Sequence, residues 1–149
     1  MIYFIISAIL IIADQLTKFA ALKYLKPLGT KEIISGMLSL TYVENRGAAF
    51  GIMQNARWLF IVFTIAVVAA AVAYTIRTKQ TDKSFLISVS LICSGGIGNL
   101  IDRICRGYVV DMIEVTFIDY PVFNFADICV VCGAVLLCIY VLFSKDVKK

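Results

Sequence analysis

Four long apolar runs, separated by polar intervals, most constrain what this chain can fold into. They occupy residues 2–22, 58–76, 85–101 and 124–143. A helix needs about 20 predominantly apolar residues to span a bilayer. Within lipid, every backbone polar group must be satisfied internally, which leaves helices and closed barrels as the spanning structures. Runs of this length therefore predict an all-α membrane protein with four transmembrane helices.

Composition supports this class and excludes others. The chain has 149 residues, of which 16% are charged, whereas a soluble domain of ordinary composition is about a quarter charged. The length predicts one domain over residues 1–149. The net charge of +4 is scattered, and no basic run is interleaved with aromatic residues, so nucleic-acid binding is not expected. No Lys or Arg precedes Lys18, which favours a retained helix over a cleaved signal peptide.

The absence of histidine and the apolar setting of the cysteines exclude several kinds of catalytic and metal site. There is no histidine, which excludes Ser-His-Asp systems and the H-E-x-x-H zinc helix. Neither a metal nor a cofactor is expected. Cys129 and Cys132 form a C-x-x-C inside an apolar run, whereas a redox motif needs an electropositive, partly exposed setting. We interpret them as core residues, with a membrane thiol oxidoreductase as a weaker alternative.

The two longer polar intervals between the spans are expected to carry short strands. Residues 37–43 and 108–118 are rich in β-formers and are predicted to pair with each other. Between the first strand and the second span, residues 44–51 contain two glycines and two alanines beside Asn45. This composition indicates a tight bend, and from this stretch alone a surface turn is the favoured interpretation.

Polar residues collect in residues 95–127, which hold five of the ten acidic residues. A carboxylate at the centre of a spanning helix costs about 2.5–3.5 kcal/mol on insertion scales, so such residues are functional candidates. With a rise of about 1.5 Å per residue, Asp14 lies about 18 Å along the first helix, and Asn99 and Asp102 lie about 21 and 25 Å along the third. Asp127 lies one turn inside the descending fourth helix. These groups should therefore converge at one end of the bundle.

Each of these groups also has a purely structural interpretation. Asp14 and Lys18 are four residues apart and can form a local ion pair. Asp102 and Arg103 can be an interfacial charged cap. Asn124 can cap the fourth helix, with Asp127 at its third position.

Asp111 has no such explanation, and it suggests a paired-carboxylate site. Two aspartates in a partly dry site cannot both ionise cheaply, so one keeps a proton. The ionised member can then accept a proton from water while the protonated one polarises a peptide carbonyl. Asp111 and Asp127 fit this arrangement best. A transporter with Asp14, Asp102 and Asp127 as a proton relay is the main rival, but it predicts internal repeats, and residues 1–76 do not resemble residues 77–149.

Five motifs, taken in order along the whole chain, resemble one family. They are Asp14-Gln15-x-x-Lys18, Asn45-Arg46-Gly47-Ala48-Ala49-Phe50-Gly51, Gly95-Gly96-Ile97-Gly98-Asn99-Leu100-Ile101-Asp102-Arg103, Val110-Asp111, and Phe123-Asn124-Phe125-Ala126-Asp127. Together they resemble lipoprotein signal peptidase (signal peptidase II), a family of bacterial membrane aspartyl proteases. Any one motif alone would be weak, whereas five in register are specific.

The resemblance implies an aspartic endopeptidase that removes the signal peptide of a diacylglyceryl-modified prolipoprotein, cleaving before the lipidated cysteine. It implies that Asp111 and Asp127 are catalytic. It also implies that nine further residues bind substrate or shape the site: Asp14, Lys18, Asn45, Gly47, Asn99, Asp102, Arg103, Asn124 and Ala126. The implied partners are prolipoproteins, membrane lipid and globomycin-type inhibitors.

The resemblance also implies a location and an orientation. The family lies in the bacterial cytoplasmic membrane with both termini in the cytoplasm and its site towards the outer face. The two long connections would build a small extracytoplasmic β-cradle. The charges agree, because the short basic loop at 77–84 and the C-terminal tail share one side, and dense basic residues in short segments mark the cytoplasmic side.

Overall fold

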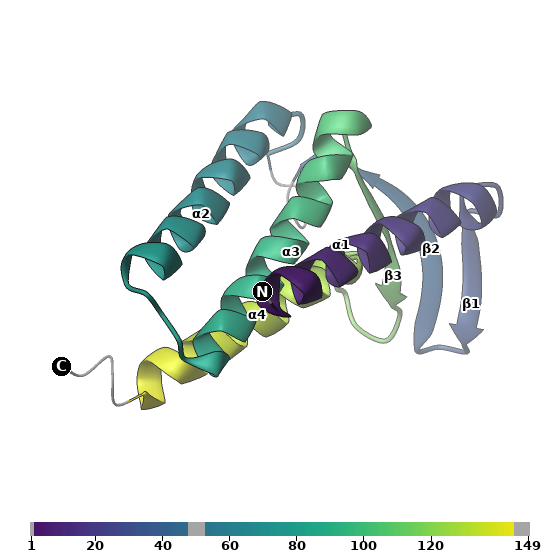
Figure 1. Cartoon of the computed structure of the whole chain (residues 1–149). Coiled ribbons are helices and arrows are strands. Elements are labelled where there is room, and N and C mark those ends of the chain that lie inside the picture. The colour runs from purple at the N-terminus through teal and green to yellow at the C-terminus, as the bar shows by residue number, and fades with distance from the viewer. Residues whose placement is uncertain (1, 48–52, 145–149) are drawn as a thin grey trace.

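A computed structural model describes residues 2–47 and 53–144, and in it the four predicted spans are helices (Figure 1). They are α1 (Ile2–Ala20), α2 (Arg57–Arg77), α3 (Lys83–Cys105) and α4 (Phe125–Phe143). Within the described ranges, these four helices are long and apolar enough to cross a membrane. The prediction of four spans is thereby confirmed. Residues 48–51 of the predicted bend and the tail from Lys145 to Lys149 lie outside the described residues.

The helix ends follow from local sequence. α3 begins after Asp82, whose carboxylate accepts a hydrogen bond from the Phe85 amide at 3.0 Å. α4 begins with a capping box between Asn124 and Asp127, which pairs amides that the first helical turn would otherwise leave free. α1 continues into a π-helical turn, η1 (Ala21–Leu25). α1 and η1 together extend the first span to 24 residues.

The two connections form an antiparallel sheet of three strands in the part of the chain that the structure describes. β1 (Thr30–Ile34), β2 (Leu38–Asn45) and β3 (Val109–Val115) lie in that order. The sequence predicted β2 and β3 and missed β1. Every residue of β1 is exposed and Lys31 and Glu32 lie within it, so no alternation of buried and exposed positions marks it as a strand. Its conformation is set by pairing with β2, where Thr30 lies opposite Thr41.

The register of β2 and β3 places the end of one strand beside an acidic residue of the other. Val43 lies opposite Asp111 and Asn45 opposite Val109, after an irregularity between Leu40 and Val43. The sheet lies beside the C-terminal end of α1 (Figure 1). It is attached there by a buried apolar cluster of Ala21, Leu25, Val110 and Met112.

α3 is the central helix, and its neighbours are held with different closeness. Gly95 of α3 contacts the backbone of Ala126 and the side chain of Val130, and Gly133 of α4 lies against the backbone of Ser88. A Cβ at either glycine would collide with the opposite helix, so the small residues permit close packing. α2 packs chiefly against α3, and among its described residues Ile61 alone is buried.

Candidate active site

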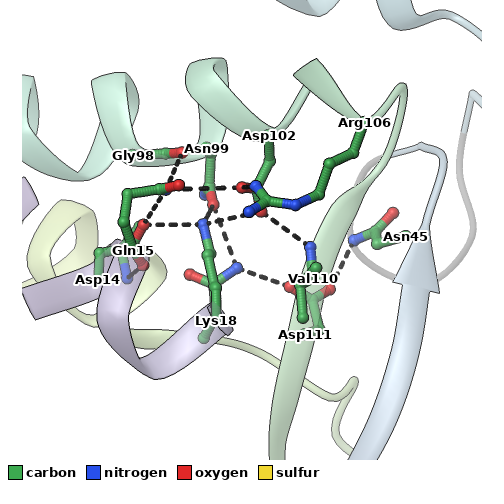
Figure 2. A network of polar contacts seen from close by, with 12 residues as sticks. Asp14, Gln15, Lys18, Asn45, Gly98, Asn99, Asp102, Arg106, Val110 and Asp111 are labelled. Atoms are coloured by element: carbon green, nitrogen blue, oxygen red, sulfur yellow. Dashed lines mark hydrogen bonds and ion pairs between the residues drawn. The ribbon is translucent and has the colours of Figure 1, made fainter. Parts of the chain in front are cut away.

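Residues from α1, α3, α4, β2 and β3 meet in one polar network at the sheet end of the helices (Figure 2). The predicted convergence is therefore present in the fold. The network has two parts. We call Asp14, Lys18 and Asp102 the closed cluster, because each is at most 1% exposed. We call Asp111 and Asp127 the open pair, because both line a groove.

Lys18 is the centre of the closed cluster and is completely buried. Its Nζ lies 2.9 Å from Oδ2 of Asp14 and 3.2 Å from Oδ2 of Asp102. Its remaining hydrogen bond goes to Oδ1 of Asn99 at 2.8 Å. An ammonium group has three protons to donate, so these three acceptors satisfy it. The predicted local ion pair of Asp14 and Lys18 exists, but it lies inside the protein and joins α1 to α3.

Asp102 interacts with α1 and the sheet. In addition to Lys18, its carboxylate accepts a hydrogen bond from the backbone N–H of Val110 at 3.0 Å and pairs with Arg106 on the next turn of α3. The prediction that Asp102 and Arg103 pair with each other as a charged cap is therefore wrong. The guanidinium that pairs with Asp102 is that of Arg106. Asp102 fixes the start of β3 relative to α3.

Asp14 connects α1 to the start of α4. Its Oδ1 accepts a hydrogen bond from the backbone N–H of Ala126 at 3.0 Å. The carboxylate fits because Gly98 faces it, and a Cβ at Gly98 would lie 2.5 Å from Oδ2 of Asp14. Asp14 thus positions the helix turn that carries Asp127, and Ala126 contributes through its backbone.

Two asparagines link the members of the open pair. The Asn124 amide donates hydrogen bonds to Oδ1 of Asp111 at 2.6 Å and to Oδ1 of Asn99 at 3.1 Å. Asn99 in turn donates to Oδ1 of Asp127 at 2.8 Å. Because Lys18 donates to Oδ1 of Asn99, the orientation of the Asn99 amide is determined. Lys18 of the closed cluster thereby orients the Asn99 amide so that its N–H group donates a hydrogen bond to Asp127.

Asp127 has two roles that the sequence had presented as alternatives. Its Oδ2 accepts a hydrogen bond from the backbone N–H of Asn124 at 3.1 Å, and its own N–H donates to Oδ1 of Asn124 at 3.0 Å. These are the bonds of the predicted cap. The same carboxylate also lines the groove, so capping holds it in place without removing it from the site.

Asp111 is buried, with 2% of its surface exposed, and its pKa is raised from 3.8 to about 6. Burial is the largest cause, since it disfavours the charged form, and the neighbouring charge of Asp127 adds to it. The hydrogen bonds from Asn45 and Asn124 act in the opposite direction. The Asn45 amide donates to Oδ2 of Asp111 at 2.9 Å, so the bend predicted as a surface turn begins at a residue of the network.

The groove beside the open pair has a volume of about 430 Å³. Four α3 residues line it: Ile92, Gly96, Asn99 and Arg103. They recur at helical spacing and so share one face of the helix. α2 and α4 supply apolar side walls, including Phe63 and Val130. An apolar channel therefore leads along α3 to two carboxylates.

Arg103 and Gly47 lie at the polar end of this groove. The guanidinium of Arg103 stacks over the ring of Phe60 at 4.8 Å and donates a hydrogen bond to the carbonyl of Gly47 at 3.3 Å. The Gly47 amide in turn donates to Oδ1 of Asn45 at 2.9 Å. All eleven predicted site residues thus lie in or beside the network, and Arg103 brings a positive charge to the groove.

Sequence reasoning missed two residues that contact the closed cluster, Gln15 and Arg106. The Gln15 amide donates to Oδ2 of Asp14 and to the Gly98 carbonyl, both at 3.1 Å. Arg106 neutralises Asp102. The signals were present, since Gln15 lies inside a quoted motif and Arg106 is four residues after Asp102, a spacing that favours an ion pair on a helix.

The C-x-x-C motif takes no part in the network. Cys129 is buried, Cys132 is exposed on α4, and both are free thiols. Neither lines the groove.

Fold and site together define a multi-pass membrane protein with a carboxylate pair at the end of an apolar groove. Comparison with known proteins is consistent with this class. The model of the family "Signal peptidase (SPase) II" matches residues 6–143. A lipoprotein signal peptidase of Clostridioides difficile is 45% identical over the full length of both chains. One of Streptococcus agalactiae is 45% identical, covering 91% of this chain and 88% of the relative.

Solved structures agree with the sequence relatives. A bacterial membrane enzyme solved at 2.3 Å resolution superposes with a TM-score of 0.89 at 33% identity, covering 99% of this chain and 91% of that one. A second, at 1.9 Å resolution, gives 0.87 at 32% identity, with 96% and 94% covered. The chain belongs to the signal peptidase II family.

Proposed function

We propose that this chain is an aspartic endopeptidase that removes the signal peptide from diacylglyceryl-modified prolipoproteins, with Asp111 and Asp127 as its catalytic pair. Family membership supports the substrate class. One observation carries the assignment of the pair. Two carboxylates from different elements, joined through Asn124 and Asn99, line the same apolar groove.

The surroundings of the pair suit water activation. One proton is shared by the two carboxylates, because two adjacent negative charges in a dry site repel each other. The ionised member takes a proton from a water molecule, and the water oxygen attacks the scissile carbonyl carbon. The protonated member donates a hydrogen bond to the carbonyl oxygen as negative charge develops there. Collapse of the tetrahedral intermediate breaks the C–N bond, and the leaving amine takes a proton from the pair.

The groove suits a substrate that arrives from the bilayer. Its apolar walls on α2 and α4 accept the apolar part of a signal peptide, and its polar end holds the bond to be cut. Arg103 and Asn45 lie there and can bind backbone carbonyls in an extended segment, which exposes the scissile bond as a helix would not. Cleavage falls before the cysteine whose diacylglyceryl group stays among the lipid chains.

We place the site towards the outer face of the bacterial cytoplasmic membrane. Arg77, Lys79 and Lys83 lie in or beside the short turn between α2 and α3, which favours the cytoplasm for that turn and for both termini. The open pair and the sheet lie at the opposite ends of the helices. The sheet is then an extracytoplasmic cradle, and the whole chain acts as one domain.

A reconstitution assay tests this function. The full chain in detergent micelles is incubated with a purified diacylglyceryl-modified prolipoprotein, and the products are resolved by mass spectrometry. We expect release of the signal peptide with the lipidated cysteine at the new N-terminus, and inhibition by globomycin. The control substrate carries serine in place of that cysteine and cannot be lipidated. Equal cleavage of both substrates, or cleavage of neither, would overturn the proposal.

A further inference from the structure

A second groove lies beside the sheet, where the first span meets it, and is separate from the groove that the carboxylate pair lines. Its volume is about 440 Å³, within the range of small-ligand sites. Thr17, Ala20 and Tyr24 of the first span form one wall, and Leu40 of β2 and Met112 of β3 form the other. It shares no lining residue with the groove that holds Asp111 and Asp127.

The two grooves are lined by different parts of β3. Val109 and Asp111 line the first groove, whereas Met112 and Ile113 line the second. Met112 belongs with Val110 and Leu25 to the buried cluster that attaches the sheet to α1. A molecule in the second groove therefore does not reach the carboxylate pair.

The open side of the second groove continues the surface that α1 presents to lipid. Thr17 and Ala20 are exposed and Tyr24 is 63% exposed, although all three lie within the 24-residue span. A side chain on the outer face of a spanning helix is surrounded by lipid. The groove is thus an indentation in the lipid-facing surface, at the end of the span where acyl chains meet headgroups.

One cation lines this otherwise apolar space. Lys31 of β1 lies opposite Leu40 of β2 and is exposed. In the part of the chain that the structure describes, no ion pair or hydrogen bond engages its ammonium group. By contrast, the nearby Lys26 pairs with Glu44 at 3.0 Å. A free ammonium at the interfacial end of an apolar groove complements a phosphate whose attached chains are apolar.

We propose that this groove binds a glycerophospholipid of the bilayer, with one acyl chain against Ala20 and Met112 and the phosphate beside Lys31. Apolar lining alone would suit any acyl chain. Lys31 adds the preference for a phosphate, which the diacylglyceryl group of a lipoprotein lacks.

Photocrosslinking tests the site in the full chain. The protein is placed in nanodiscs of phosphatidylethanolamine and phosphatidylglycerol, with a trace of phosphatidylglycerol that carries a diazirine on one acyl chain. Crosslinked peptides are quantified by mass spectrometry. We expect labelling within residues 17–28 and 112–125 to exceed, several-fold, that of the exposed α2 residues Val62 and Ile65. Uniform labelling of all exposed apolar faces would overturn the proposal.

Two variants test the acyl-chain contact and the phosphate contact separately. Ala20→Trp should fill the groove and lower its labelling several-fold, whereas Ile9→Trp, on an exposed part of α1 about 16 Å away, should not. Lys31→Glu changes an exposed residue, so folding should be retained, and it should lower labelling by repelling the phosphate. Unchanged labelling in Lys31→Glu would overturn the phosphate assignment. If excess lipidated prolipoprotein displaced the labelled phospholipid, the groove would be a substrate-binding site, and the proposal of a bilayer phospholipid site would be overturned.

Discussion

The closed cluster and the open pair are built from the same acidic side chain in opposite surroundings. Asp14 and Asp102 lie beside the cations Lys18 and Arg106, and each is at most 1% exposed. Asp111 and Asp127 are held by the neutral amides of Asn45, Asn99 and Asn124. The carboxylates of the closed cluster are paired with positive charges, whereas those of the open pair are held in position by uncharged hydrogen-bond donors.

This difference has a chemical consequence. A buried carboxylate that pairs with a cation holds that cation in place, as Asp14 and Asp102 hold Lys18. A carboxylate held by amides keeps its geometry and can still gain or lose a proton near neutral pH, as the raised pKa of Asp111 indicates. Pairing with a cation therefore suits a carboxylate that holds helices together, whereas hydrogen bonds from neutral amides suit a carboxylate that must transfer a proton. Asn99 connects the two, since it accepts from Lys18 and donates to Asp127.

The largest effect is expected from neutralising the open pair. Asp111→Asn and Asp127→Asn each remove a proton carrier but keep the side-chain shape, so processing should fall by about 10²- to 10⁴-fold while the protein stays folded. Processing of lipidated prolipoprotein is the measurement. Asp119→Asn, at an exposed position after β3, is the control. Normal processing by both variants of the pair would contradict the assignment.

Breaking the closed cluster should instead reduce stability. Lys18→Met leaves Asp14 and Asp102 without the cation between them, and loss of one partner of a buried ion pair costs about 3–5 kcal/mol. Thermal unfolding in detergent micelles should show a large drop. Lys26→Met is the matched control, because that lysine pairs with Glu44 at the surface and should change little. Equal unfolding temperatures for Lys18→Met and Lys26→Met would contradict the structural role of the closed cluster.

Two glycines of α3, Gly96 and Gly98, are two residues apart and face opposite sides of the helix, and they give a sharper test. Gly98→Ala places a methyl group 2.5 Å from Oδ2 of Asp14, whereas Gly96→Ala faces the groove and lies 3.4 Å from a methyl group of Thr64. The first should lower the free energy of unfolding by about 1–3 kcal/mol through overpacking. The second should leave unfolding close to wild type. Similar unfolding midpoints for both would show that the closed cluster tolerates expansion.

Asn45→Ala should lower turnover without abolishing it. The change removes one hydrogen bond to Asp111, and a bond to a charged group contributes about 1.5–3 kcal/mol. Partial compensation by water should leave a loss of about tenfold in kcat. A complete absence of folded protein would assign Asn45 to the scaffold instead.

The smallest effect concerns pH. The pKa of Asp111 is higher in the folded chain, at about 6, than its ordinary value of 3.8, so the folded state holds this proton more tightly than the unfolded state. The resulting stability is present below pH 4 and is lost as pH rises through 6. Between pH 5 and pH 7 its contribution should fall by about 1 kcal/mol. Asp111→Asn should lack this component, and identical pH profiles for variant and wild type would argue against it.

The spans were predictable because bilayer thickness constrains length and composition directly. The convergence of Asp14, Asn99, Asp102 and Asp127 followed from helix rise and alternating direction alone. β1 was not predictable, since all five of its residues are exposed and its pairing with β2 alone defines it. The extension of the first span as a π-helical turn at Ala21–Leu25 also had no signal in the apolar pattern.

Contacts within the site divide in the same way. The Asn124–Asp127 cap is local and could be predicted from four residues. The bond from Asn45 to Asp111 depends on the register of β2 against β3, including the irregularity between Leu40 and Val43. The pairing of Asp102 with Arg106 is also local, because residues four apart share one face of a helix and adjacent residues do not.

The glycine contacts between α3 and α4 have a consequence for motion. Gly95 and Gly133 lock the two helices at two points along their length, and these helices carry Asn99 and Asp127. Neither helix can slide without driving backbone into backbone. α2, which rests chiefly on α3 and has Ile61 as its one buried residue among those described, has no such lock. Widening of the groove to admit a bulky chain therefore falls to α2, and the carboxylate pair keeps its geometry as the wall beside it opens.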